Sequence, residues 1–230
     1  MRCRTPNLIS ERYRDLNGVL GGSFDPIHSA HVSQALEVQQ ALGLWRVTLV
    51  PAGQCPYKNG HAADAKHRLA MAQLAIQPHH AFLSVDSVEI DREGPSYALD
   101  TVKSLGLEEA GGVLIVGADA FATLSSWHKH LELLSIVDIA VVNRPWNSEC
   151  DPAKAVPEMV WAECEDWLLP EGFRMWVSTE GAHVVLVPTT QSVLSSSEVR
   201  KTLATGGKVE AGTLSKEVLD YIQAHHLYGA

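Results

Sequence analysis

The sequence predicts an α/β fold in which the strands of a parallel sheet alternate with helices. Residues 112–116 (Gly-Val-Leu-Ile-Val) form a continuous apolar run, which is typical of a strand buried on both faces. Residues 17–20 and 45–50 are also strand-like, and the apolar residues from Val32 to Val38 between them recur at helical spacing. Two strands that flank one helix are expected to be parallel, with a right-handed crossover. The 230 residues, 46% of them hydrophobic, suffice for one sizeable core, as a single domain or as a domain with an appendage.

The remaining elements follow from the same two patterns. Further strands are expected at residues 82–85, 87–90, 136–142 and 183–188, and further helices at 63–76, 96–105, from 195 onward and at 214–225. Trp127 is placed in a helix that follows the central strand. Between residues 146 and 182 the periodicity weakens, and the segment is either a helical insert over the site or a surface excursion. It holds four tryptophans, Trp146, Trp161, Trp167 and Trp176.

Composition excludes several classes of protein. The formal net charge of −9 argues against a general nucleic-acid surface, although it permits a small phosphate pocket. Apolar runs stay well short of the roughly 20 residues of a membrane span. Residues 1–16 are polar and predict a flexible extension before a folded domain at 17–230. The four cysteines (Cys3, Cys55, Cys150 and Cys164) are scattered, which favours free thiols in a reducing cytoplasm over disulfides or a zinc site.

The most informative stretch is Gly-Gly-Ser-Phe-Asp-Pro-Ile-His-Ser-Ala-His at residues 21–31. Two glycines at a strand end let the backbone turn sharply and approach a ligand closely. Asp25 is expected to cap the next helix, with Pro26 in its first turn. His28 and His31 are three residues apart and therefore share one helix face. The pattern favours contact with a phosphorylated ligand, over histidines that pack or cap and over a metal site.

A second such stretch, Leu-Ser-Ser-Ser-Glu-Val-Arg, occupies residues 194–200. Ser195 and Glu198 have the spacing of a capping box, which predicts a helix start. Helix N-termini attract phosphate through free amide groups and the helix dipole, and Arg200 in the second turn is able to fork onto phosphate oxygens.

Five other residues carry weaker signals. Lys58, in a loop after a strand, is a phosphate contact or simply a solvated lysine. Gly117 and Asp119 follow the central strand, where they are equally suited to a ribose or to a helix cap. Tyr97 and Trp127, taken alone, are more typical of packing than of recognition.

Together these residues resemble a known family. Residues 21–31 resemble the first signature of the HxxH nucleotidyltransferase superfamily, and residues 194–200 resemble its second, the ISSTxxR motif. Within that superfamily, several shorter pieces resemble the bacterial nicotinate-nucleotide adenylyltransferases, and the resemblance extends over residues 17–228. The pieces are Pro56-Tyr57-Lys58, His67-Arg68, Ser96-Tyr97 with Asp100-Thr101, Gly117-Ala118-Asp119, Trp127, Arg144-Pro145, and Tyr221-Ile222 with His226-Leu227-Tyr228.

The resemblance implies a Rossmann-like, doubly wound parallel sheet in a single domain with a small C-terminal helical part at 195–230. It implies a cytoplasmic enzyme of NAD biosynthesis that transfers the adenylyl group of ATP to nicotinate mononucleotide, releasing pyrophosphate. Mg²⁺ would arrive with ATP and no metal would be held by the protein alone. Nucleic acid and membrane are not expected as partners, and a homo-oligomer is left open.

The resemblance also assigns roles to residues. The catalytic group would be His28, His31 and Arg200. ATP would be bound by Gly21, Gly22, Ser23, Phe24, His28, His31, Gly117, Asp119, Ser196, Ser197 and Arg200. The acceptor mononucleotide would be bound by Lys58, Tyr97, Trp127 and Arg144.

Two alternatives remain at this stage. One is a transferase of the same superfamily that uses nicotinamide mononucleotide, phosphopantetheine or a phospho-alcohol as its acceptor. A non-catalytic nucleotide-sensing module is the more distant alternative. A dehydrogenase is disfavoured, because the glycines lack the G-x-G-x-x-G spacing.

Overall fold

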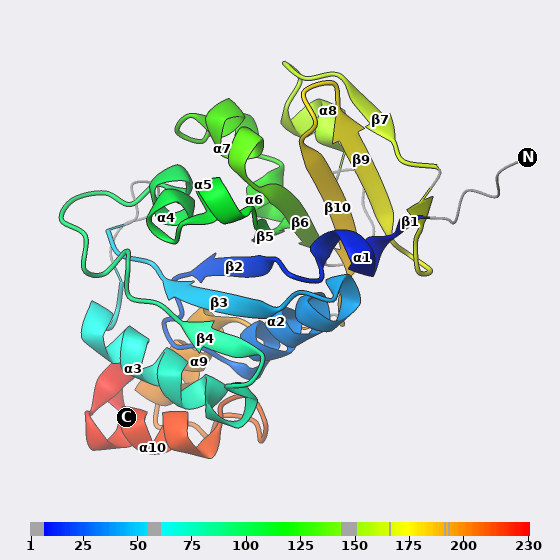
Figure 1. Ribbon diagram of the computed structural model, residues 1–230. Helices are drawn as coiled ribbons and strands as arrows, with labels where there is room; N and C mark the ends of the chain where they lie inside the picture. The colour runs from blue at the N-terminus through cyan, green and yellow to red at the C-terminus, as the bar shows by residue number, and fades with distance from the viewer. Residues whose placement is uncertain (1–6, 55–60, 144–150, 166, 191, 193) are drawn as a thin grey trace, which may run out of the picture.

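The computed structural model describes residues 7–54, 61–143, 151–165, 167–190, 192 and 194–230. Its main feature is an eight-stranded sheet with the strand order β4-β3-β2-β5-β6-β10-β9-β7 (Figure 1). The first six strands in this order are parallel to their neighbours, and β9 and β7 continue the sheet in antiparallel fashion. The strands are β2 (Asn17–Gly22), β3 (Arg46–Pro51), β4 (Leu83–Val85), β5 (Val113–Gly117), β6 (Asp138–Asn143), β7 (Trp161–Glu163), β9 (Arg174–Ser178) and β10 (His183–Pro188).

The parallel strands follow the doubly wound order, since the first strand of the sheet in the chain, β2, lies between β3 and β5. The predicted Rossmann-like α/β class is therefore confirmed. A two-stranded parallel ladder joins β1 (Asn7–Leu8) to β8 (Trp167–Leu168).

Helices cover both faces of the sheet (Figure 1). One face carries α1 (Ile9–Tyr13), α2 (Ser29–Leu42), α3 (Ala65–Ile76), α9 (Ser196–Ala204) and α10 (Lys216–Ala224). The other carries α4 (Ala98–Ser104), α5 (Leu107–Ala110), α6 (Ala118–Phe121), α7 (His130–Ile136) and α8 (Pro152–Ala155). Short 3₁₀ turns are η1 (Gln77–His79), η2 (Leu124–Ser126) and η3 (Leu227–Gly229). None of the helices in the described ranges has the length and apolar character needed to cross a membrane.

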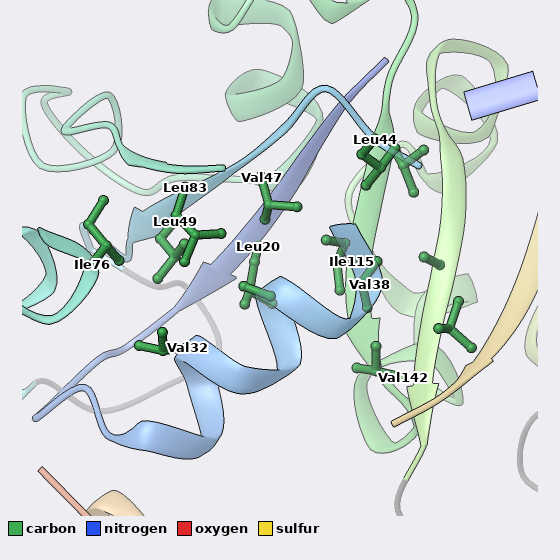
Figure 2. Packing of buried hydrophobic residues seen from close by; sticks show 14 of the residues in the cluster. Leu20, Val32, Val38, Leu44, Val47, Leu49, Ile76, Leu83, Ile115 and Val142 are labelled. Carbon is green, nitrogen blue, oxygen red and sulfur yellow. The ribbon is translucent and has the colours of Figure 1, made fainter. Parts of the chain in front are cut away.

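The core consists of two apolar layers, because successive strand residues point to opposite faces. Leu20, Ile115 and Val142 belong to the layer under α2, and Figure 2 shows them together with Val32 and Val38 of that helix. Their chain neighbours Val19, Leu114 and Val141 belong to the layer under α4 and α7. This division explains why the central strands are continuously apolar in the sequence.

The N-terminal segment differs from the expected flexible extension over residues 1–16. From Asn7 onward it is folded: Ile9 and Tyr13 are 4% and 0% exposed, and they pack in the layer under α2. Arg12 donates to Asp138 at the start of β6 through Nη2 (2.7 Å) and Nε (2.9 Å). The apolar signal of α1 rests on two residues four apart, which is too short to register as a periodic pattern. Residues 1–6 lie outside the described part of the chain.

The tryptophan-rich segment widens the sheet. In its described part, β9 pairs with β10, with Trp176 opposite Val184, and β7 pairs with β9. Trp176 is 8% exposed in the layer under α4 and α7, and the Trp161 indole donates to the Val156 carbonyl (3.2 Å). The alternatives of a helical insert or a surface excursion are therefore wrong for these residues. Strands of three and five residues offer little periodicity from which to predict them.

A third correction concerns residues 87–90, expected as a strand. They form a turn in which the Asp86 carboxylate accepts from the Val88 amide (2.8 Å) and Ile90 N–H donates to Ser87 O (2.8 Å). An aspartate that bonds the backbone two residues on favours a turn over a strand. Cys164 is buried, whereas Cys3, Cys55 and Cys150 lie outside the described residues, so the expectation of free thiols stays a prediction.

Candidate active site

The site lies at the carboxyl ends of β2 and β5, where the strand order reverses. Such a switch point is where open α/β sheets bind their ligands. The register that pairs Leu20 with Ile115 places Gly22 level with Gly117. A Cβ at Gly21 or Gly117 would meet no atom of the described residues within 4 Å, so the fold itself does not demand glycine at either position. A Cβ at Gly22 would lie 2.8 Å from the Phe24 ring, so this glycine is required for packing.

The loop after β2 runs from Ser23 to His28 and is buried from Phe24 onward. Phe24 has a left-handed backbone (φ 46°), and the peptide bond between Asp25 and Pro26 is cis. α2 begins only at Ser29, and its N-cap is His28. The expected helix cap at Asp25 and first-turn position for Pro26 are therefore wrong, because both residues precede the helix.

His28 and His31 are brought together at the start of α2, as their spacing predicts. Their rings stack with centroids 3.7 Å apart and planes at 22°. The backbone N–H of His28 donates to Nδ1 of His31 (3.2 Å), so the proton of the neutral His31 ring lies on Nε2. Burial, together with the neighbouring His28, lowers the pKa of His31 to about 3. His31 is consequently a neutral hydrogen-bond donor at physiological pH.

The N-terminus of α9 is docked onto this loop. Ser196 Oγ donates to the carbonyl of Pro26 (2.9 Å), and Nη1 of Arg200 donates to the carbonyl of Asp25 (2.5 Å). Nη2 of Arg200 also donates to Ser197 Oγ (3.2 Å). Residues four apart on a helix share a face, which lets Ser196 and Arg200 reach the same loop. The two sequence motifs, about 170 residues apart, thus form one surface.

The helix start at Ser195 is confirmed, but the capping box with Glu198 is not formed. Ser195 is the N-cap, yet within the described residues its hydroxyl makes no capping hydrogen bond. The first backbone amides of α9 are therefore not capped by the Ser195 side chain. A helix N-terminus whose amides are not capped favours binding of an anion.

The end of β5 leads directly into α6, with Gly117 as the N-cap and Asp119 in the first turn. Both residues are exposed at the switch point. An exposed carboxylate at this edge, such as that of Asp119, is an acceptor well placed for hydroxyl groups.

Aromatic side chains gather beyond the same edge. Tyr97 is the N-cap of α4, and its ring lies 4.4 Å from the ring of His128. Trp127 is half-buried, with Nε1 donating to Thr123 Oγ1 (3.4 Å). Trp127 lies in a bend between η2 and α7, so its expected place within a helix is wrong. Lys58 and Arg144 fall outside the described residues, and their roles stay predictions.

Glu89 was not singled out by the sequence, yet it links a loop to a helix at this edge. Its carboxylate accepts from the amide of Gly53 (3.3 Å) and from the hydroxyl of Thr101 (2.7 Å). A Cβ at Gly53 would lie 2.0 Å from the Glu89 carbonyl oxygen, so only glycine permits this approach. Glu89 thereby joins the segment after β3 to α4.

Arg68 and Tyr228 are further residues whose importance only the structure shows. Arg68 is 2% exposed and donates to the carbonyls of Ser23 (2.9 Å) and Ala63 (3.2 Å). Tyr228 reaches the same loop from the C-terminus. Both occur in short pieces that resemble the family, which is the one signal that could have found them.

Among the described residues, no group of three or more His, Cys, Asp or Glu side chains lies close enough together to hold a metal ion.

Comparison with known proteins agrees with this geometry. Residues 19–202 match the model of the cytidylyltransferase-like family. A probable nicotinate-nucleotide adenylyltransferase from Acidithiobacillus ferrooxidans is 37% identical over 218 residues, covering 91% of this chain and 94% of the relative. One from Roseiflexus sp. is 41% identical over 215 residues, covering 92% and 96%.

A solved structure shares the fold. Plasmodium falciparum nicotinic acid mononucleotide adenylyltransferase, complexed with NaAD, superposes with a TM-score of 0.67 and 17% identity, over 93% of this chain and 97% of that chain. Identity this low shows the fold alone, whereas the bacterial relatives show the family. The chain therefore belongs to the nicotinate-nucleotide adenylyltransferase family.

Proposed function

We propose that the protein transfers the adenylyl group of ATP to the 5′-phosphate of nicotinate mononucleotide, giving nicotinate adenine dinucleotide and pyrophosphate. The observation that carries the proposal is the docking of α9 onto the loop that precedes α2. Ser196 and Arg200 contact the carbonyls of Pro26 and Asp25, and this brings the imidazole pair and a helix N-terminus to one switch point. Family membership supports the choice of acceptor.

The phosphates of ATP would lie between the two motifs. His31 offers an Nε2–H donor without a positive charge, held in orientation by the bond from His28 N–H to its Nδ1. Arg200 uses Nη1 and Nη2 on Asp25 and Ser197, and a guanidinium carries five N–H donors. The remaining N–H donors of Arg200, together with the Ser197 hydroxyl and the first backbone amides of α9, would hold the β and γ phosphates of ATP.

The adenosine and the acceptor would occupy the two sides of the switch point. Gly21, Gly22, Ser23 and Phe24 would border ATP, and the open backbone at Gly117 with the carboxylate of Asp119 would receive the ribose. Tyr97 and Trp127 would flank the planar pyridine ring, since an aromatic face stacks well on such a ring. We propose that Lys58 and Arg144 neutralise the acceptor phosphate.

The reaction requires that the two substrates be positioned, and it requires no nucleophile from the protein. A phosphate oxygen of the mononucleotide attacks the α-phosphorus of ATP, the bond from that phosphorus to the bridging oxygen breaks, and pyrophosphate leaves. A phosphate monoester is largely ionised at neutral pH, because its second pKa is about 6, so no general base is needed. The protein aligns the reactants and supplies hydrogen bonds to the developing charge. Mg²⁺ would arrive as the MgATP complex, since it usually keeps phosphate and water ligands.

The test is an acceptor panel with pyrophosphate release as the readout and the product identified by mass. Nicotinate mononucleotide should be turned over in preference to nicotinamide mononucleotide, phosphopantetheine and a phospho-alcohol. If another acceptor reacted and nicotinate mononucleotide did not, the assignment of the acceptor would be wrong. If ATP bound and no acceptor reacted, the protein would be a nucleotide-sensing module.

A further inference from the structure

The carboxylate of Asp25 is buried, at 4% exposed, and it accepts three hydrogen bonds from two other segments of the chain. Oδ2 accepts from the amide of Ala62 (2.7 Å), and Oδ1 accepts from the amide of Ala63 (3.2 Å). Oδ1 also accepts from the hydroxyl of Tyr228 (2.7 Å). Asp25 therefore ties the loop before α2 to the residues before α3 and to the C-terminal turn. None of the roles assigned to the active site uses this carboxylate.

Tyr228 stands in the final 3₁₀ turn, the third residue from the C-terminus, with a left-handed backbone (φ 58°). The turn lies against the end of α9, since a Cβ at Gly229 would be 3.3 Å from Ala204 Cα. Figure 1 shows the C-terminus next to α3 and α10. Burial, with the Asp25 carboxylate, raises the pKa of the Tyr228 hydroxyl. The hydroxyl is therefore a permanent donor at any pH at which the enzyme would work.

The hydrogen bond between Tyr228 and Asp25 fixes the loop that leads to His28 and His31. Asp25 is three residues before His28, and its own carbonyl is the acceptor for Arg200. A carboxylate held by a charge-assisted hydrogen bond keeps the short segment between them from shifting. Displacements of about 1 Å at a reacting centre can cost about a hundredfold in rate.

We propose that Tyr228 is a positioning residue, which through Asp25 holds the imidazoles of His28 and His31 and the guanidinium of Arg200 in line with the phosphates of ATP. The proposal deepens the function given above and rests on it. It predicts that the turn at Leu227–Gly229 affects catalysis without touching substrate.

The test compares Tyr228→Phe with Tyr221→Phe. Each substitution removes one partly buried tyrosine hydroxyl from the C-terminal segment. The Tyr221 hydroxyl, however, is hydrogen-bonded to His67 Nδ1 (2.9 Å) rather than to Asp25. We expect Tyr228→Phe to lower kcat about tenfold, which is ~1.4 kcal/mol in the barrier. The KM for ATP should change by no more than about twofold, because ground-state binding depends less on this alignment. Tyr221→Phe should retain kcat, with a thermal midpoint shifted as much as that of Tyr228→Phe.

A second readout does not depend on turnover. ¹⁵N spectra of the histidine side chains should show His31 as the neutral Nε2–H form in the wild type and a changed His31 signal in Tyr228→Phe. If wild-type protein failed to adenylate nicotinate mononucleotide, the proposed function would fail while this spectrum still tested the positioning role. An unaltered His31 signal, a kcat within about twofold of wild type, or an equal loss in Tyr221→Phe would each overturn the proposal.

Discussion

His31→Asn separates the two tasks that the structure gives to this imidazole. In an asparagine the side-chain oxygen takes a place near that of Nδ1, so an acceptor remains for the His28 amide, which donates over 3.2 Å in the native protein. The Nε2–H donor, proposed to meet the phosphates, is lost. We expect the variant to stay folded at pH 7.5 and its kcat to fall about a hundredfold, as is usual when one preorganised donor to a developing charge is removed.

The lowered pKa of His31 fixes how much the free energy of unfolding of the wild type should change with pH. The folded pKa of His31 is about 3, compared with 6.5 for an ordinary histidine. As the pH falls below 6.5, His31 binds a proton in the unfolded chain but stays neutral in the folded protein. Acid therefore favours the unfolded chain, and the free energy of unfolding of the wild type falls. The loss reaches about 2 to 3 kcal/mol at pH 4.5 and is absent at pH 7.5. His31→Asn has no such group, so its stability relative to the wild type should rise by this amount between pH 7.5 and 4.5.

The assay is urea denaturation of both proteins at the two pH values, with His80→Asn as the control for an exposed histidine. A wild-type minus variant difference that stayed constant across this range would contradict the lowered pKa of His31. A difference that moved in favour of the wild type in acid would mean that folded His31 binds a proton more readily than the unfolded chain. Activity within about threefold of wild type would refute its role toward the phosphates.

Three further substitutions test other parts of the site. Arg200→Lys should lower kcat/KM for ATP about 10- to 100-fold, because a point-like ammonium cannot serve the Asp25 carbonyl and a phosphate together; a change below about threefold would contradict this. Gly117→Ala should leave the thermal midpoint within about 1 °C, since its Cβ meets no described atom within 4 Å, yet it should weaken binding of an ATP analogue measured by calorimetry. Gly53→Ala should cost about 1 to 3 kcal/mol in urea denaturation, because its Cβ would lie 2.0 Å from the Glu89 carbonyl oxygen; wild-type stability would contradict the close approach.

Much of the fold was predictable because its signals are local. A strand buried on both faces must be apolar at every position, so residues 112–116 indicated β5 without reference to the rest of the chain. The same holds for the paired histidines, whose three-residue spacing at a helix start puts their rings together. The short elements were missed for the converse reason: α1, β7 and β9 are too brief for a period to emerge, and their apolar residues gain meaning only against a sheet.

The convergence of the motif residues was predictable from the sequence, whereas the hydrogen bonds that support them were not. The motif residues His28, His31, Ser196 and Arg200 do converge. Asp25 was expected to cap a helix, since aspartate before a helical stripe usually does, but its carboxylate bonds Ala62, Ala63 and Tyr228 instead. Lys58 and Arg144 remain predictions from the resemblance.

By itself the sequence determined the class of fold and the edge of the sheet at which the motif residues converge, because apolar runs and motif spacings express local geometry. Only the tertiary structure decided how that edge is held together. Arg200 meets Asp25, Glu89 meets Gly53, and Tyr228 meets Asp25. These are single hydrogen bonds between segments far apart in the chain. Such a bond needs only one donor and one acceptor, which leave no pattern in a sequence, and it forms where the packing of the two layers brings them within reach.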